Sequence, residues 1–359
     1  MNEMKIIHTS DIHLDSPLTT RLPADQVRER RRELLSGFGR LVEEAKLMGV
    51  GAMLISGDLF DSDRISRKAL DTALDVIESA PSITFFYLQG NHEGDAFLTG
   101  RRALPENLMT FGSDWTYYSA PGLTIAGRSE IQEGMFEDLD LPENTQNIVL
   151  LHGELRDRCA SPEVIGVRDA AGKNIDYMAL GHYHSYSVEA IDDRGAAIYS
   201  GTPEGRGFDE TGDKGYVLIE TGERRIKYSF HSFAKRKIHI VPIDLNGAVR
   251  TAEISERTER ALRDISSNDI VRLELVGRYF PTLWKDIDAL VDEFGDRFYY
   301  FEVKDSSKMA INPEDYKHDK TLKGEFIRTV SADESLDEQT REKIIACGIN
   351  ALMGEELFD

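Results

Sequence analysis

Short β-rich runs alternate with helical stretches in the first part of the chain, and this alternation limits the fold more than any other feature. Residues 4–10, 51–57 and 82–90 are β-rich, whereas residues 24–49 and 65–80 repeat their apolar side chains with helical spacing. The order strand, helix, strand, helix, strand predicts a sheet with parallel strands and helices on its faces. In such sheets, ligands bind beyond the carboxyl ends of the strands.

Further β-rich runs continue to about residue 235, and several of them are spaced like hairpins. They cover residues 147–153, 175–182, 196–201, 214–220 and 225–233. Such runs predict a second, partly antiparallel sheet packed against the first. We therefore expect an α/β (α+β) core, a two-sheet β-sandwich flanked by helices.

The alternation restarts after residue 235, as strand, helix, strand, helix, strand. At 359 residues the chain exceeds a typical single domain. We therefore predict a large domain over residues 1–235 and a small α/β domain with a C-terminal helix over residues 236–359. The apolar face of that helix carries Ile345, Ile349, Leu352 and Met353. We expect this face to cover its own domain, since most such faces do, and binding of a partner is the alternative.

Composition limits the class of partner. The chain has 64 acidic and 43 basic residues, a net charge of −21, which opposes loose attraction to nucleic acid through many phosphate contacts. A local site where metal cations and a few arginines meet one phosphate remains open. No run of about 18 apolar residues suggests a membrane span, so we expect no membrane partner. The N-terminus lacks the order of a secretory signal, and Cys159 and Cys347 are expected to be free thiols, as in a cytoplasmic protein.

Chemically active side chains follow the ends of five β-rich runs. They are Asp11 and His13, then Asp58, then Asn91, then His152, and finally His182 and His184. Each motif is weak when taken singly. Because all of them follow strand ends, we expect these side chains to converge on one edge of the core. Five motifs that share this position are poorly explained by chance.

Carboxylate, amide and imidazole ligands without thiolate suit divalent ions such as manganese, iron or zinc. Seven ligands are too many for one ion. We expect Asp58 to bridge two ions, with Asp11, His13 and His184 completing one site and Asn91, His152 and His182 the other. Two metal ions about 3.5–4 Å apart can clamp a phosphate and lower the pKa of a water that they share. Phosphoester hydrolysis is the reaction that matches such a site. His92 would protonate the leaving oxygen or brace the phosphate, and Asp15 and Asp61 would orient ligands or cap backbone groups.

The motifs "DIH", "GDLFD", "GNHE", "HG" and "GHYH", in this order, resemble the signature of calcineurin-like metallophosphoesterases. Within them, they resemble the SbcD/Mre-type DNA repair exonucleases. The stretches "TSDIHLDSPL" and "YSGTPEGRGFDETGDKGYVLIE" are similar to the YhaO-like branch. The resemblance covers roughly residues 4–235 and implies the metallophosphoesterase fold, cleavage of DNA phosphodiesters, and a small cap domain that helps admit the strand. One departure is Glu93, where these nucleases commonly have Asp.

The resemblance also implies roles for individual residues. It places the metal ligands on the seven residues named above and the catalytic histidine on His92. It implies two divalent ions, Mn²⁺ first with Fe²⁺ or Zn²⁺ as alternatives, an SMC-like ATPase subunit as partner, and a homodimer. Arg101 and Arg102 follow "GNHE" and are candidates for contacts to the substrate. The basic clusters at 28–32 and 235–237 are further candidates, although such clusters are more often a solvated face.

Three alternative functions remain at this point. Serine/threonine phosphoprotein phosphatases share "GNHE", but their "GDxVDRG" motif is "GDLFDSDR" here and the expected arginine position is not met. Phosphodiesterases of cyclic nucleotides or nucleotide lipids use the same kind of metal centre, and the acidic charge suits them. A non-catalytic scaffold would keep the fold, but loss of ligands would be its mark, and none is lost.

Overall fold

The computed structural model describes residues 3–16, 18, 22–61, 65–91, 97–98, 102–159, 161–222 and 225–353. Contacts divide the chain into two compact units, Met1–Ile238 and His239–Asp359, and each has its own apolar core. The role of the second unit as a cap stays a prediction. Among the described residues, no helix combines the length and the apolarity that a membrane span requires.

The first unit contains two six-stranded sheets. The first sheet has the order β14-β13-β1-β2-β3-β4. Its strands are β1 (Lys5–Thr9), β2 (Ala52–Ser56), β3 (Thr84–Leu88), β4 (Leu108–Thr110), β13 (Gly215–Glu220) and β14 (Lys227–Ser232). Strands β1 to β4 are parallel, and β13 and β14 add to this sheet as an antiparallel hairpin. The parallel part is the one predicted from the alternation of strands and helices.

The second sheet has the order β11-β12-β10-β7-β6-β5. Its strands are β5 (Thr116–Ala120), β6 (Leu123–Gly127), β7 (Gln146–His152), β10 (Tyr177–Gly181), β11 (Ser187–Ala190) and β12 (Ala196–Tyr199). The four central strands are parallel, and β5 and β11 are antiparallel edges. Short elements on this side are η1 (Met135–Asp138), β8 (Glu154–Arg156), β9 (Val164–Gly166) and α3 (Val167–Ala170).

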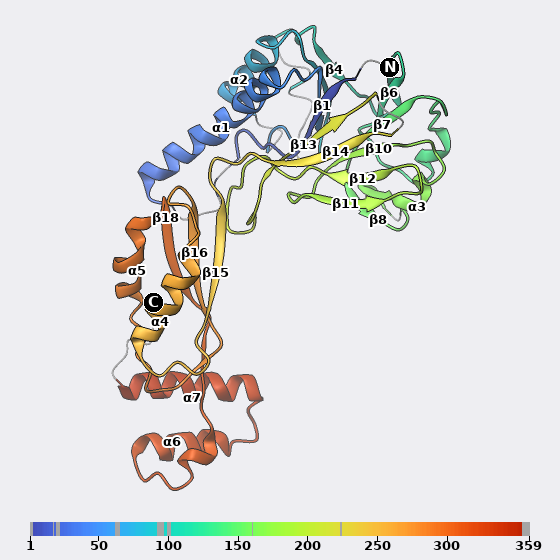
Figure 1. Cartoon of the computed structure of the whole chain (residues 1–359). Helices are drawn as coiled ribbons and strands as arrows, with labels where there is room; N and C mark the ends of the chain where they lie inside the picture. Colours follow the sequence, from blue (N-terminus) through green and yellow to red (C-terminus); the bar gives the residue numbers. More distant parts are fainter. Residues whose placement is uncertain are drawn as a thin grey trace. The chain divides into compact units, whose positions relative to one another are not determined.

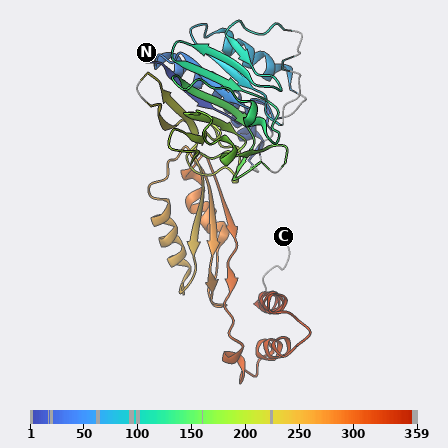
Figure 2. The same ribbon diagram turned by 90° about the vertical axis from the view of Figure 1, so that its right-hand side faces the viewer.

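Alternating side chains of each strand explain why the sheets stack. In β1, Ile6 packs into the core between the two sheets, whereas Ile7 packs into the core beneath the helices. The helices α1 (Ala24–Leu47) and α2 (Arg67–Glu78) cover that outer face of the first sheet (Figures 1 and 2). This arrangement confirms the predicted two-sheet sandwich flanked by helices.

A buried ionic cluster fixes α1 against the segment that follows β14. The Glu33 carboxylate accepts hydrogen bonds from Arg30 (2.9 Å), Lys235 (2.6 Å) and Arg236 (2.8 Å). Arg30 also donates to Glu204 at 2.9 Å, and its side chain is 1% exposed. The arginines of the 28–32 cluster therefore do not all face solvent.

Replacing Glu33 by Ala is expected to destabilise the fold by about 3–5 kcal/mol, because it leaves buried cations without their partner. Burial raises the pKa of Glu33, but Arg236, Lys235 and Arg30 outweigh it and lower the pKa from 4.5 to about 2. The carboxylate thus contributes stability above pH 4.5 that is lost as the pH falls toward 2. Urea unfolding of wild type and variant, at neutral pH and across this window, measures both effects. Glu43→Ala, which removes an exposed pair with Lys46, should cost under about 1 kcal/mol; equal losses would contradict the buried role.

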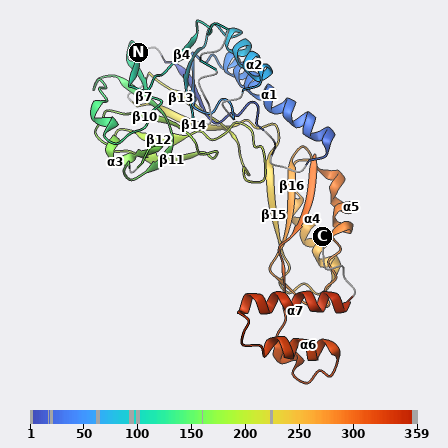
Figure 3. The same ribbon diagram turned by 180° about the vertical axis from the view of Figure 1, so that it is seen from behind.

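The second unit contains a three-stranded sheet of order β15-β16-β18. Its elements are β15 (Ile238–Asp244), α4 (Thr251–Leu262), β16 (Ile270–Val276), β17 (Arg278–Tyr279), α5 (Ile287–Phe294), η2 (Gly295–Arg297), β18 (Tyr300–Asp305), β19 (Lys308–Met309), η3 (Pro313–Tyr316), α6 (Leu322–Ser331) and α7 (Glu338–Met353). Helices α6 and α7 lie side by side (Figure 3). Ile345 and Ile349 of α7 are buried against Ile327 of α6, whereas Leu352 is 44% exposed. Two of the four residues of the predicted apolar face, Ile345 and Ile349, thus pack within their own unit.

Candidate metal centre

The loops that follow β1, β2 and β10 have unusual backbone conformations. Four predicted ligands have positive φ angles: Asp11 (50°), His13 (49°), Asp58 (50°) and His182 (109°). Among the residues that the structure describes, two other non-glycine residues, Glu163 and Asn174, share this conformation. Such a backbone costs on the order of 1–3 kcal/mol per residue and persists where surrounding contacts impose it. Strain of this kind collects at functional sites, and here it marks the carboxyl edge of both sheets.

Hydrogen bonds hold these loops against one another. The backbone N–H of Asp11 donates to the carbonyl of Gly57 at 3.1 Å, and that of His13 donates to the carbonyl of Asp58 at 3.0 Å. From the other sheet, the backbone N–H of His182 donates to the two carboxylate oxygens of Asp11, at 3.0 and 3.2 Å. Strand ends from both sheets therefore meet at one place.

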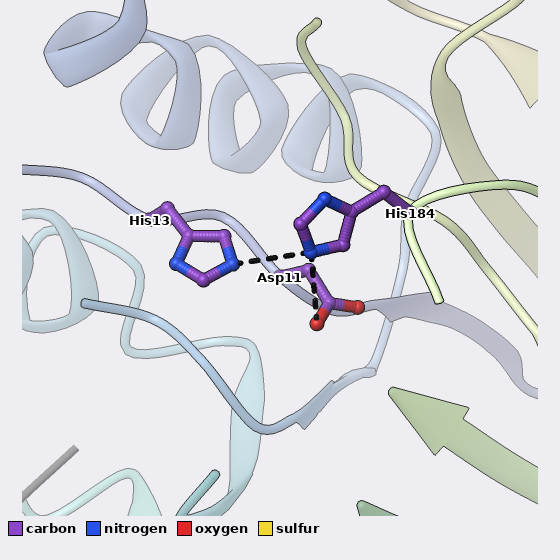
Figure 4. Close-up of side chains that lie close together, drawn as sticks. All are labelled: Asp11, His13 and His184. Carbon is purple, nitrogen blue, oxygen red and sulfur yellow. Dashed lines mark hydrogen bonds and ion pairs between the residues drawn. The ribbon is translucent and has the colours of Figure 1, made fainter. Parts of the chain in front are cut away.

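Acidic partners orient the rings of His13 and His184. Nδ1 of His13 lies 3.0 Å from the Asp61 carboxylate, and Nδ1 of His184 lies 2.7 Å from the Glu210 carboxylate. A ring whose Nδ1–H donates outward presents an unprotonated Nε2 inward. The two Nε2 atoms are 3.4 Å apart, and that of His184 is 3.8 Å from Oδ1 of Asp11 (Figure 4). Two nitrogen lone pairs facing each other beside a carboxylate fit a shared cation.

His152 has the same orientation on the other side of the centre. Its Nδ1 lies 2.9 Å from the carbonyl of Ser56, and its Nε2 lies 2.9 Å from Oδ1 of Asn91. Burial lowers the pKa of His152, but a hydrogen bond to Asp58 and the charges of Asp11 and Asp58 outweigh it and raise the pKa to about 9. The buried carboxylates thus favour a positive charge at this position.

The Asp58 carboxylate lies between the two sides. Its Oδ2 is 3.4 Å from Nε2 of His152 and 3.9 Å from Nε2 of His13. Two groups of side chains could each hold a metal ion, because within each group the possible ligand atoms lie within 4.8 Å of one another. The first set is Asp11, His13 and His184, and the second set is Asp11, Asp58 and His152. The two sets share Asp11, and Asp58 belongs to the second set alone. Its Oδ2 nevertheless lies within 4 Å of a histidine from each set, and its role as the bridging ligand stays a prediction.

The remaining predicted site residues differ in where they lie. The ring of His182 packs edge-on against that of His152, with centroids 5.6 Å apart, and belongs to neither set. His92 and Arg101 lie outside the described residues. Arg102 donates to Asp75 and Glu78 of α2, each at 2.7 Å, so its guanidinium is engaged by carboxylates.

The sequence matches the profile of the calcineurin-like phosphoesterase family over residues 4–210, more than half of the chain. Those residues include all seven predicted ligands and the strands that carry them. The chain belongs to this family. Its family membership makes it a metallophosphoesterase, and the two ligand sets are candidates for a dinuclear metal site.

Relatives of this phosphoesterase extend the match beyond the family domain. It is 26% identical to the uncharacterized metallophosphoesterase YhaO of Bacillus subtilis over 315 residues, 82% of this chain and 77% of the relative. It is 25% identical to the DNA double-strand break repair protein Mre11 of Sulfurisphaera tokodaii over 330 residues, 86% of this chain and 82% of the relative. For the protein of that name from Methanosarcina acetivorans, 24% identity over 264 residues covers 70% of this chain and 42% of the relative.

The donors at the centre of this phosphoesterase fit divalent ions. They are carboxylates, imidazoles and the Asn91 amide, a set that suits manganese, iron or zinc. Cys159 and Cys347 are free thiols and belong to neither ligand set. The inward Nε2 atoms and the buried carboxylates are the features that a cation would satisfy.

Sequence reasoning missed part of the outer layer of the site. Glu210 bonds His184, and Arg206 donates to Glu210 at 2.6 Å and lies 3.2 Å from Nδ1 of His184. Burial raises the pKa of Glu210, but His184 and Arg206 outweigh it and hold the pKa at about 2. Of the two predicted orienting carboxylates, Asp61 contacts His13, whereas Asp15 accepts the backbone N–H of Ser66. Arg206 and Glu210 both lie in the loop between β12 and β13, where no helical or strand pattern marks them.

Gly90 provides a test of the packing around the metal ligands. A Cβ at this position would lie 2.0 Å from Oδ1 and 2.5 Å from the backbone nitrogen of Asp58. We expect Gly90→Ala to displace Asp58 and lower metal affinity by about 10- to 100-fold, as loss of an orienting partner does. Isothermal titration with Mn²⁺ measures this. Gly112→Ala is the control, because no atom lies within 4 Å of its added Cβ; equal affinities in both variants would contradict the tight fit.

Proposed function

We propose that this phosphoesterase is a metal-dependent DNA phosphodiesterase, a cytoplasmic exonuclease of the DNA-repair type that also has single-strand endonuclease activity. The observation that carries the hydrolytic part is the pair of ligand sets that share Asp11, with the Asp58 carboxylate within 4 Å of a histidine from each set. The name of the Mre11 relatives supports DNA as the substrate. The alignment with the Sulfurisphaera tokodaii relative, over 330 residues, exceeds the 4–210 family domain and so includes much of the second unit.

Residues of the chain would divide the work of catalysis among them. Asp11, His13, Asp58, Asn91, His152, His182 and His184 would hold two divalent ions, Mn²⁺ in our proposal. Bound ions would supply stabilisation of phosphate charge and an activated water. Asp61 and Glu210 keep the Nε2 atoms of His13 and His184 aimed inward. His92 would deliver a proton to the leaving oxygen.

A partner would reconcile the substrate with the charge of the chain. A net charge of −21 opposes extended contact with a polyanion. We propose that an SMC-like ATPase subunit supplies much of the DNA-binding surface and that the phosphoesterase acts as a homodimer within this complex. Coexpression with a candidate ATPase and light scattering of the purified complex test both parts.

One observation favours a second candidate function. Arg102, proposed to contact DNA, has its guanidinium engaged by Asp75 and Glu78. An arginine paired in this way is not free to contact the phosphates of a long strand. A phosphodiesterase of cyclic nucleotides or nucleotide lipids would need no such contact, because it would use the same metal centre on a smaller substrate.

A substrate panel separates these functions. Purified protein with Mn²⁺ is offered single-stranded DNA, duplex DNA, a cyclic nucleotide and a phosphoserine peptide, each with and without EDTA. We expect EDTA-sensitive release of nucleotides from DNA and an intact phosphopeptide. Cleavage of the cyclic nucleotide alone would replace the proposal with the second candidate.

A further inference from the structure

We propose that a basic cavity beside the candidate metal centre binds phosphate groups of a nucleic-acid strand next to the bond that is cleaved. This inference rests on the proposed DNA phosphodiesterase function and gives it a substrate subsite. The cavity has a volume of about 420 Å³ and lies between the first turns of α1, the start of α2 and the loop after His13. Arg28, Arg31, Arg32 and Lys68 line it, together with leucines that make its wall partly apolar.

The three arginines form one face of α1. Positions 28, 31 and 32 are separated by three and four residues, the spacing that places side chains on the same side of a helix. Arg30 lies between them in sequence but is turned inward, where it pairs with Glu33 and Glu204. The helix thus uses one arginine to hold the fold and exposes the others in the cavity.

The four cations of the cavity are not neutralised by the carboxylates of the described residues. Within this described part of the chain, Arg28, Arg31, Arg32 and Lys68 form no ion pair and no side-chain hydrogen bond, although acidic residues outnumber basic ones by 64 to 43. The carboxylate of Asp15 also lines the cavity, but it accepts the backbone N–H of Ser66 at 3.1 Å. Like charges three and four residues apart on a helix repel one another, so an anion in the cavity would relieve this repulsion.

The cavity wall is continuous with the outer layer of the metal centre. Ser16 lines the cavity, and its hydroxyl accepts a hydrogen bond from Arg206 at 2.9 Å. Arg206 also contacts Asp61 at 3.1 Å and Nδ1 of His184 at 3.2 Å. A strand with one phosphate at the metal ligands could therefore place a neighbouring phosphate among the cations.

Guanidinium groups favour phosphate as the ligand. Each presents a planar set of donors that can bond two phosphate oxygens at once, and it does so without reading the bases. Leucine side chains of the same cavity can pack against sugars. A small cyclic phosphodiester would occupy the metal centre alone, so the cavity would distinguish a polymer from such a substrate.

The test compares binding and catalysis in the double variant Arg31→Gln/Arg32→Gln. Anisotropy of a fluorescein-labelled single-stranded oligodeoxynucleotide, measured in EDTA, gives the Kd without turnover. We expect the Kd to rise by on the order of 10-fold or more, and the slope of log Kd against log salt to fall by about 0.7 for each phosphate that the variant no longer binds. Hydrolysis of bis(p-nitrophenyl) phosphate with Mn²⁺ should keep the wild-type kcat/KM, because this small ester does not reach the cavity.

Arg67→Gln is the matched control. Arg67 adjoins Lys68 on α2, is 94% exposed and does not line the cavity. An equal rise in Kd for this variant, or an unchanged Kd for the double variant, would overturn the subsite while leaving DNA cleavage by the wild type intact. Conversely, a wild type that binds the oligonucleotide through Arg31 and Arg32 but cleaves only cyclic nucleotides would support the subsite and refute the proposed function.

Discussion

Asp58→Asn is expected to abolish most phosphoesterase activity and to weaken both metal positions together. The carboxylate lies 3.4 Å from Nε2 of His152 and 3.9 Å from Nε2 of His13, so its charge serves both sides of the centre. Loss of several kcal/mol of charge stabilisation corresponds to a rate lower by on the order of 10³- to 10⁵-fold. Metal content after gel filtration and kcat/KM on bis(p-nitrophenyl) phosphate measure the two effects.

Asp61→Asn is expected to have a smaller effect on metal binding than Asp58→Asn. Asp61 contacts Nδ1 of His13 and is not itself among the possible ligand sets. Its replacement should weaken metal binding by about 10- to 100-fold, on the His13 side alone.

For Asp58→Asn, the contradicting outcome is retention of two ions per chain at wild-type affinity. That result would show that the assignment of Asp58 as the bridging ligand is wrong.

The strand-end arrangement could be predicted because both of its parts are local patterns. Apolar alternation marks β1, β2 and β3, and the chemically active residues follow each within a few positions. Since parallel strands share a carboxyl edge, topology alone brings Asp11, Asp58 and Asn91 together. What the sequence does not contain is the left-handed backbone of Asp11 and Asp58, which arises from contacts between loops of different strands.

Other features depend on tertiary packing that no local pattern encodes. The run at 28–32 reads as one basic cluster, yet α1 buries Arg30 and exposes Arg31, because the helix face that meets Glu204 is set by the fold. Glu210 reaches His184 from the long loop between β12 and β13, well beyond the end of β12, so a strand-end position does not mark it. Helix α6 went unpredicted because its apolar face is short and is completed by α7.

His92→Ala is expected to slow DNA cleavage by ~10²- to 10⁴-fold while metal content stays unchanged, if the proposed proton transfer to the leaving oxygen is lost. The size of the loss should depend on the leaving group. A deoxyribose oxygen leaves poorly without a proton, whereas p-nitrophenolate leaves readily, so a p-nitrophenyl ester should lose much less rate. Comparing kcat on an oligonucleotide with kcat on this ester isolates the proton transfer from metal binding.

The control for His92 is His318→Ala, which removes an exposed histidine from the second unit and should retain full activity. Equal losses of His92→Ala on both substrates would assign His92 to bracing the phosphate, because a contact to the phosphate is needed whichever group leaves. A variant that cleaves DNA at the wild-type rate would remove His92 from the mechanism altogether. In that case the proton for the leaving oxygen would have to come from water or from another residue of the chain.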